Sequence, residues 1–253
     1  MQLHHKVYGS GPAIILLHGL LGSADNWHPV ALALAERFQV FALDQRNHGQ
    51  SPHAGEMNYQ LMAEDVHEFM AAQGIARAVV AGHSMGGKTA MQFALQFPEK
   101  VEKLLVEDMA PRAYPPAYAP ILAALRALDL SRFASRAEIE HALAPEIPGL
   151  TLRRFLLKNL GRDSNGKFCW KINLPGLAEN YPRLGQPISH PQPFAKPALF
   201  IRGGQSDYLG KADEPLIREL FPWAEFQTIP AAGHWVHADQ LEAFLALTLD
   251  FLS

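Results

Sequence analysis

The sequence has few of the features that would assign a protein to a specialised class. Its 253 residues include one cysteine, Cys169, which excludes a disulfide within the chain and favours a reducing compartment. No apolar run approaches the roughly 18 residues of a membrane-spanning helix, and the first residues lack the apolar stretch of a signal peptide. These absences predict a cytoplasmic protein that does not enter membranes.

An excess of charge is also absent. The 22 Lys and Arg residues are balanced by 25 Asp and Glu residues, and a net charge of −3 does not fit a general nucleic-acid binder. No phosphate-binding loop or dinucleotide fingerprint occurs, which argues against nucleotide-dependent chemistry. With 48% apolar and 19% charged residues, the composition is that of a globular protein and excludes a disordered chain.

Short apolar runs recur before glycine-containing turns, as is typical of buried parallel strands. These runs lie at 13–17, 40–43, 78–81, 104–106, 198–201 and 226–229. Segments 59–72 and 88–96 carry apolar residues at helical spacing. The alternation predicts an α/β fold with a doubly wound, mostly parallel sheet, in which ligands bind beyond the carboxyl ends of the strands.

Residues 111–195 interrupt this alternation. The segment is rich in proline at both ends and shows helical periodicity in three stretches, 121–130, 137–143 and 150–160. We expect an inserted helical cap here, with residues 1–110 and 196–253 forming the α/β core. The cap holds eleven basic and six acidic residues. This positive excess would attract anionic substrates to an opening beneath the cap, or the charges would simply lie on a solvated outer face.

The sequence Gly82-His83-Ser84-Met85-Gly86 lies between a predicted strand and a predicted helix. This is the context in which a G-x-S-x-G motif presents a nucleophilic serine, because the strained turn projects the hydroxyl above the sheet. The amide end of the helix favours negative charge, so the Met85 amide is a candidate oxyanion donor. A second turn, at residues 18–22, is expected to place the Leu20 amide beside it, with His18 ordering the loop.

A serine hydroxyl needs a base, and His234, beyond the last predicted strand, is the best candidate. Two carboxylates compete to orient its ring. Asp108 and Asp207 each follow a predicted strand at the carboxyl edge of the sheet, and their spacing leaves the choice open. The other carboxylate is then a secondary partner of the site or a helix cap.

The remaining histidines are expected to be structural. His83 adjoins the serine but points elsewhere along the turn, and His48 orders the loop at 44–49. His234 and His237 form an H-x-x-H pair, but a third ligand at helical spacing is missing, so no metal is expected.

Candidate substrate contacts fall in the cap and in the helix after the serine. An apolar acyl pocket would be lined by Phe155, Leu156, Phe168 and Trp170, although the same spacing suits packing within the cap. Lys88 would either meet a substrate carboxylate or, as we expect, pair with a protein carboxylate.

Several motifs in order resemble the α/β-hydrolase superfamily over nearly the whole chain. They are residues 18–22, 44–51, 82–88 and 233–235. Arg-Asn-His-Gly at 46–49, Gly-Gly-Lys at 86–88 and Asp-Met-Ala-Pro at 108–111 resemble the small acyl-CoA esterase-like bacterial branch and its abhydrolase relatives. The resemblance implies serine hydrolase activity on acyl esters or thioesters. It also implies a triad acid after the sixth strand, matching Asp108, or at the superfamily's commoner place after the seventh, matching Asp207.

We therefore expect a cofactor-free carboxylesterase or thioesterase that acts on short to medium acyl chains through an acyl-enzyme. Its partner would be a small-molecule substrate, and the protein would be a monomer or a homodimer. A carbon–carbon bond hydrolase or lyase with the same triad is the alternative enzyme, because one fold hosts many activities. A ligand receptor without catalysis is a further alternative, disfavoured because serine, histidine and acid are all present.

Overall fold

A computed structural model describes residues 1–253 and has a seven-stranded sheet at its centre. The strand order is β1-β3-β2-β4-β5-β8-β9. Strand β1 runs antiparallel to β3, and all the other pairs are parallel. The prediction of a doubly wound, mostly parallel α/β sheet is confirmed. The strands are β1 (His5–Tyr8), β2 (Ala13–Leu17), β3 (Gln39–Leu43), β4 (Ala78–His83), β5 (Val101–Glu107), β8 (Ala198–Gly203) and β9 (Ala224–Ile229).

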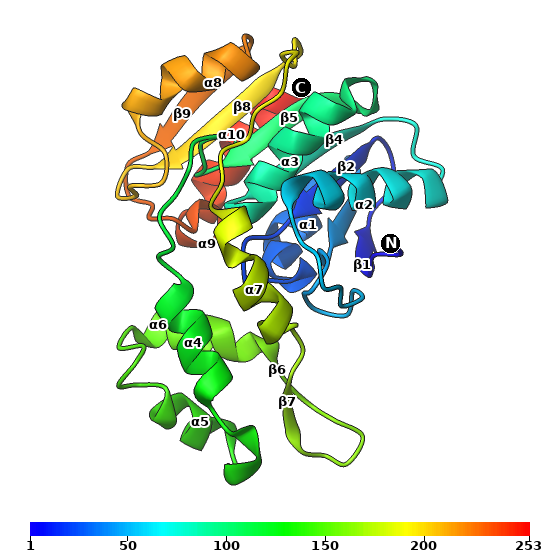
Figure 1. The fold of residues 1–253 in the computed structure, drawn as a ribbon. Helices are drawn as coiled ribbons and strands as arrows, with labels where there is room; N and C mark the ends of the chain where they lie inside the picture. Colours follow the sequence, from blue (N-terminus) through cyan, green and yellow to red (C-terminus); the bar gives the residue numbers. More distant parts are fainter.

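Helices cover both faces of the sheet (Figure 1). Side chains alternate between the faces of a strand, so Ile15 and Leu17 of β2 enter one apolar cluster while Ile14 and Leu16 enter the other. The larger cluster packs against α2 (Tyr59–Ala72), α3 (Met85–Gln96) and α8 (Glu214–Leu220). The smaller one packs against α1 (His28–Leu34), α9 (Val236–Asp239) and α10 (Leu241–Leu252). None of the helices combines the length and the apolar character needed to cross a bilayer.

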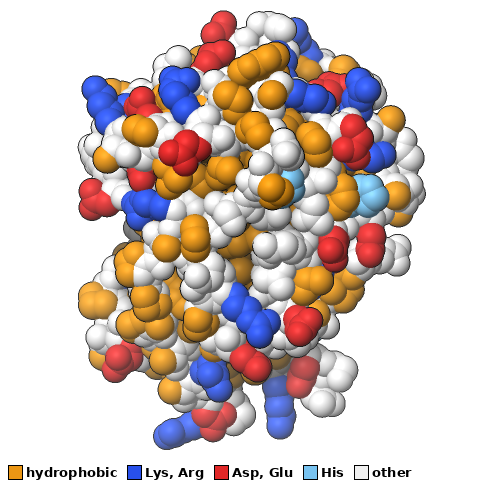
Figure 2. All heavy atoms as spheres, turned by 45° about the horizontal axis from the view of Figure 1, so that its top comes forward, with side chains coloured by type: hydrophobic (Ala, Val, Ile, Leu, Met, Phe, Trp, Pro, Cys, Tyr) orange, Lys and Arg blue, Asp and Glu red, His pale blue; other side chains and the backbone are white.

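The chain leaves the sheet between β5 and β8 and forms a separate group of elements at the lower end of the molecule in Figure 1. These are α4 (Ala119–Ala127), α5 (Arg136–Ala142), α6 (Leu150–Leu156), β6 (Leu160–Arg162), β7 (Phe168–Trp170) and α7 (Leu174–Leu184). We call residues 111–195 the cap segment. On the face of the molecule seen in Figure 2, Lys and Arg side chains are interspersed with Asp and Glu. Most basic residues of the cap segment are exposed, which favours a solvated outer surface for its charges.

Two parts of the cap segment differ from expectation. The helix expected over residues 150–160 ends at Leu156, is followed by a single 3-10 turn at Leu157–Asn159, and gives way at Leu160 to the antiparallel hairpin β6–β7. The turn of this hairpin is closed by the amide of Asp163, which donates to the Lys167 carbonyl at 2.8 Å, and by Gly166 at φ +74°. Helix α7, which contains Pro182, was not predicted.

Polar contacts join the cap segment to loops of the core. The Asn159 side chain donates to the carbonyl of Leu21 at 2.7 Å, and Asn180 donates to that of Gly55 at 2.7 Å. In the opposite direction, the Tyr59 hydroxyl donates to a carbonyl at the end of α7 at 2.9 Å. These contacts fix the cap segment over the carboxyl ends of the strands.

Candidate active site

The serine lies on a tight turn between β4 and α3. Ser84 has φ +53° and ψ −117°, a conformation that costs energy for any residue with a side chain. The turn needs glycine on both sides, because the chain passes very close to itself. A Cβ on Gly82 would lie 2.1 Å from the Gly86 carbonyl oxygen, and one on Gly86 would lie 2.2 Å from the carbonyl oxygen of Leu17. The sequence therefore fixes a strained, protruding serine.

His234 lies beside this serine. Its Nε2 atom is 2.9 Å from the Ser84 hydroxyl oxygen, and its Nδ1 atom is 2.7 Å from a carboxylate oxygen of Asp108. With Nδ1–H donating to the carboxylate, Nε2 is left as the acceptor for the serine proton. The Asp108 side chain is fully buried and that of His234 is 15% exposed. The structure thus brings Ser84, His234 and Asp108 into one hydrogen-bonded chain.

Asp108 is held by several groups at the end of β5. Its backbone has φ +48°, and its carboxylate accepts from the Gly203 amide at 3.0 Å and from the Ser206 hydroxyl. These two donors hold the carboxylate in a single orientation, in which one of its oxygens faces Nδ1 of His234. Asp207, the other candidate acid, is exposed at the pocket wall and makes no hydrogen bond to His234.

The loop at residues 18–22 is anchored by two buried histidines. His48 accepts from the Leu21 amide at 3.1 Å, and His18 accepts from the Gln45 amide at 3.0 Å. Burial lowers the pKa of both rings, that of His48 to about 3, so each remains a neutral acceptor. The Leu20 amide between these anchors donates to no protein group, and its residue lines the same pocket as Met85.

A second layer of histidines lies behind His234. His83 donates from Nε2 to the His234 carbonyl at 2.8 Å, and burial lowers the pKa of His83 to about 3. His237 lies 2.8 Å from the fully buried carboxylate of Glu107, to which it donates from Nδ1. Burial would raise the pKa of Glu107, but the contacts with His237 and the nearby His83 hold it below its usual range. His237 is thus occupied by a carboxylate partner.

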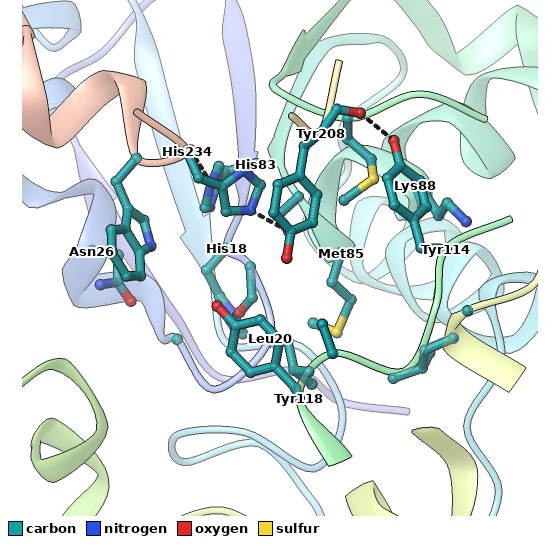
Figure 3. A pocket seen from close by; sticks show the side chains of 18 of the residues that line it. His18, Leu20, Asn26, His83, Met85, Lys88, Tyr114, Tyr118, Tyr208 and His234 are labelled. Carbon is teal, nitrogen blue, oxygen red and sulfur yellow. Dashed lines mark hydrogen bonds between the residues drawn. The ribbon is translucent and has the colours of Figure 1, made fainter. Parts of the chain in front are cut away.

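Above Ser84 a cavity of about 330 Å³ lies between the sheet and the cap segment (Figure 3). Its walls are mainly apolar and aromatic, with a group of five tyrosines, Tyr59, Tyr114, Tyr118, Tyr181 and Tyr208. Phe155 also lines the cavity and lies 5.4 Å from the Trp235 ring, measured between ring centroids. Cavities of this size and lining bind small molecules.

Three expected pocket residues lie elsewhere. Leu156 is fully buried among apolar side chains, because it occupies the inner face of α6. Phe168 and Trp170 lie on β7, which the hairpin directs away from the cavity, and the Arg162 guanidinium covers the Phe168 ring at 4.2 Å. Of the four residues expected in the acyl pocket, the cavity above Ser84 is therefore lined by Phe155 and not by these three.

Lys88 is buried at one end of the cavity without a carboxylate partner. Its ammonium donates to the Gln186 carbonyl at 2.6 Å and lies 4.9 Å from the centre of the Tyr114 ring. Burial, together with repulsion by Arg112, lowers the pKa of Lys88 to about 7. The expected pairing of Lys88 with a protein carboxylate is therefore wrong.

Some residues that contact the site were not predicted from the sequence. Asn159 and Glu107 carry no local motif that would identify them, and the H-x-x-H spacing of His237 does not indicate its carboxylate partner. Tyr208 directly follows the candidate acid Asp207, so its place in the loop after β8 was a usable clue.

The order of the sheet, the serine on a strand-to-helix turn and the histidine beyond the last strand define an α/β hydrolase. A family model for the alpha/beta hydrolase fold matches residues 12–241, and the chain belongs to this family. The resemblance inferred from the motifs is confirmed.

Relatives with assigned names match nearly the whole chain. It is 37% identical to sn-1-specific diacylglycerol lipase ABHD11 of Mus musculus, with 96% of this chain and 81% of that protein covered. It is 34% identical to esterase YbfF of Escherichia coli, with 95% and 92% covered. A solved marine microorganism esterase is 46% identical, covers 99% of both chains and superposes with a TM-score of 0.97.

Proposed function

We propose that this protein hydrolyses carboxylic esters, and thioesters of the same acyl groups, by way of an acyl-enzyme. The observation that carries the proposal is the chain of contacts from Ser84 through His234 to the buried Asp108. A serine hydroxyl becomes a nucleophile when a neighbouring base accepts its proton. The names of the similar proteins, which are lipases and esterases, support the same reaction.

In the first half of the reaction, the Ser84 oxygen attacks the acyl carbon while its proton passes to Nε2 of His234. The carboxylate of Asp108 stabilises the imidazolium that forms. The amides of Leu20 and Met85 hold the negative oxygen of the tetrahedral intermediate. Met85 begins α3, so its N–H has no partner within the helix. The imidazolium then gives its proton to the departing alcohol or thiol, which leaves an ester on Ser84.

In the second half, water attacks this ester with His234 again taking the proton. Collapse of the second intermediate releases the carboxylic acid and restores Ser84. The cavity of about 330 Å³ and its aromatic walls suit acyl chains of short to medium length. Phe155 at the wall and the tyrosines would contact the apolar part of the substrate.

The test is a panel of p-nitrophenyl esters and acyl thioesters with acyl chains of two to sixteen carbons. We expect turnover to be highest for the shorter chains and to fall once the acyl group exceeds the cavity. A vinylogous diketone, the substrate type of a carbon–carbon bond hydrolase, should not be cleaved. Cleavage of the diketone without cleavage of any ester would contradict the proposal.

Asn159→Ala should slow the reaction by disturbing the loop at residues 18–22, which carries the Leu20 amide. Asn159 is buried, and its loss leaves the Leu21 carbonyl without its donor from the cap segment. We expect kcat to fall about tenfold with little change in KM, since a misplaced oxyanion donor weakens transition-state binding. Stability should fall by about 1–3 kcal/mol for the unsatisfied buried carbonyl. Asn165→Ala, in the exposed hairpin turn, is the matched control; an equal effect of both changes on kcat would refute this role.

A further inference from the structure

The ring of Tyr208 stacks on the imidazole of His234. Their centroids are 3.7 Å apart and their planes differ by 19°, the shortest separation among the aromatic pairs of the molecule. Figure 3 shows the two rings side by side at the edge of the cavity. Such close, nearly parallel contact places the electron-rich face of the phenol against the whole imidazole.

The backbone of Tyr208 is fixed from two directions. Its amide donates to the Ser206 hydroxyl at 3.2 Å, and its carbonyl accepts from the Tyr114 hydroxyl and, at 3.4 Å, from the Arg112 guanidinium. These contacts fix the backbone of Tyr208, and with it the starting point of the side chain, without any bond to the imidazole. Burial raises the pKa of Tyr208, so the phenol stays neutral where the reaction runs.

Apart from Tyr208, the groups around His234 contact the edge of its imidazole or lie tilted or farther away. Asp108 occupies Nδ1 and Ser84 occupies Nε2. His83, with centroids 4.7 Å apart, is tilted by 48° and neutral, so it does not repel a protonated neighbour. Trp235 is farther away, at 6.4 Å. Asp108 is thus the charged group in contact with the imidazole edge, and Tyr208 is the aromatic group stacked on its face.

We infer that Tyr208 is a positioning residue whose ring face stabilises the protonated form of His234 and holds the imidazole between Ser84 and Asp108. A cation over an aromatic face is attracted by the ring quadrupole, more strongly where water is excluded. The imidazole takes up the serine proton as Ser84 attacks, so the contact strengthens in the transition state and raises kcat. This inference rests on the ester hydrolysis proposed above.

The test compares Tyr208→Leu with Tyr208→Phe. Leucine removes the π face, and phenylalanine keeps it without the hydroxyl. For Tyr208→Leu we expect kcat to fall about tenfold at nearly constant KM. The acidic limb of the profile of kcat/KM against pH should move about one pH unit lower, because the protonated imidazole loses a stabilising contact. Tyr208→Phe should retain both the rate and the profile.

Labelling by a fluorophosphonate, measured across the same pH range, provides a readout that does not depend on acyl binding. Its rate in Tyr208→Leu should show the same shift of the acidic limb. Thermal unfolding midpoints establish that the variants are folded, and Tyr208→Met replaces the leucine variant if that one is not. Hydrolysis that fails already in the wild-type protein would refute the proposed function instead.

Three results would overturn the inference while leaving that function intact. One is a leucine variant with unchanged kcat and an unmoved pH profile. Another is a rise in KM alone, which would make Tyr208 only a wall of the cavity. The third is equal damage from Phe and Leu, which would assign the effect to the hydroxyl.

Discussion

Ser84→Ala should lower kcat for ester hydrolysis by about 10⁴- to 10⁶-fold and abolish labelling by fluorophosphonates. The variant removes the oxygen that lies 2.9 Å from Nε2 of His234, and no other hydroxyl is bonded to that atom. Alanine retains the Cβ of serine, so the turn between β4 and α3 should keep its shape. Steady-state rates and the mass of the labelled protein measure the two effects.

The control for this change is Ser253→Ala, because the last residue is exposed and distant along the chain from the motif. It should keep full activity and full labelling. Undiminished turnover in Ser84→Ala would show that hydrolysis proceeds without the serine and would remove the acyl-enzyme from the mechanism. A label found on another residue would have the same meaning.

Asp108→Asn should lower kcat by about 10⁴-fold, whereas Asp207→Asn should change it by less than about twofold. The Asp108 carboxylate accepts from Nδ1 of His234, from the Gly203 amide and from the Ser206 hydroxyl. An amide in this position presents its own N–H to one of these donors and favours the wrong imidazole tautomer. Asp207 is exposed and makes no such contact.

The two variants should be compared at several pH values and after thermal unfolding has shown that both are folded. A large loss at Asp207 with a small one at Asp108 would reassign the acid to the loop after β8. Equal, mild losses would mean that neither carboxylate orients the imidazole during catalysis.

The core of the fold could be predicted because its buried strands appear in the sequence as continuous apolar runs. The run at 78–81 is apolar throughout, as a central strand covered on both faces requires, and all of β4 is buried. The hairpin β6–β7 has no such apolar run. Its strands have only three residues each and are half-buried, so the local pattern resembles the end of the preceding helix.

The choice between Asp108 and Asp207 could not be made from the sequence for a geometric reason. Both follow neighbouring parallel strands, β5 and β8, and therefore arrive at the same edge of the sheet. What separates them is the direction of the side chain. Asp108 turns inward at φ +48°, and neither composition nor spacing specifies that backbone angle.

Lys88 and Tyr208 illustrate what lies beyond pattern analysis. A buried lysine is expected to find a carboxylate, yet Lys88 meets a backbone carbonyl that lies 98 residues later in the chain. The stacking of Tyr208 on His234 likewise depends on the path of one loop. Contacts of this kind join distant segments, so they become visible only once the chain is folded.

The hydrogen bond from Asn159 to the Leu21 carbonyl makes the two parts of the enzyme interdependent. An engineer who replaces residues 111–195 with the corresponding insertion of another hydrolase exchanges the substrate walls and also removes a support of the loop that carries Leu20. Such a chimaera would need an asparagine grafted at the equivalent point, and its turnover would then report whether new specificity can be introduced without losing rate.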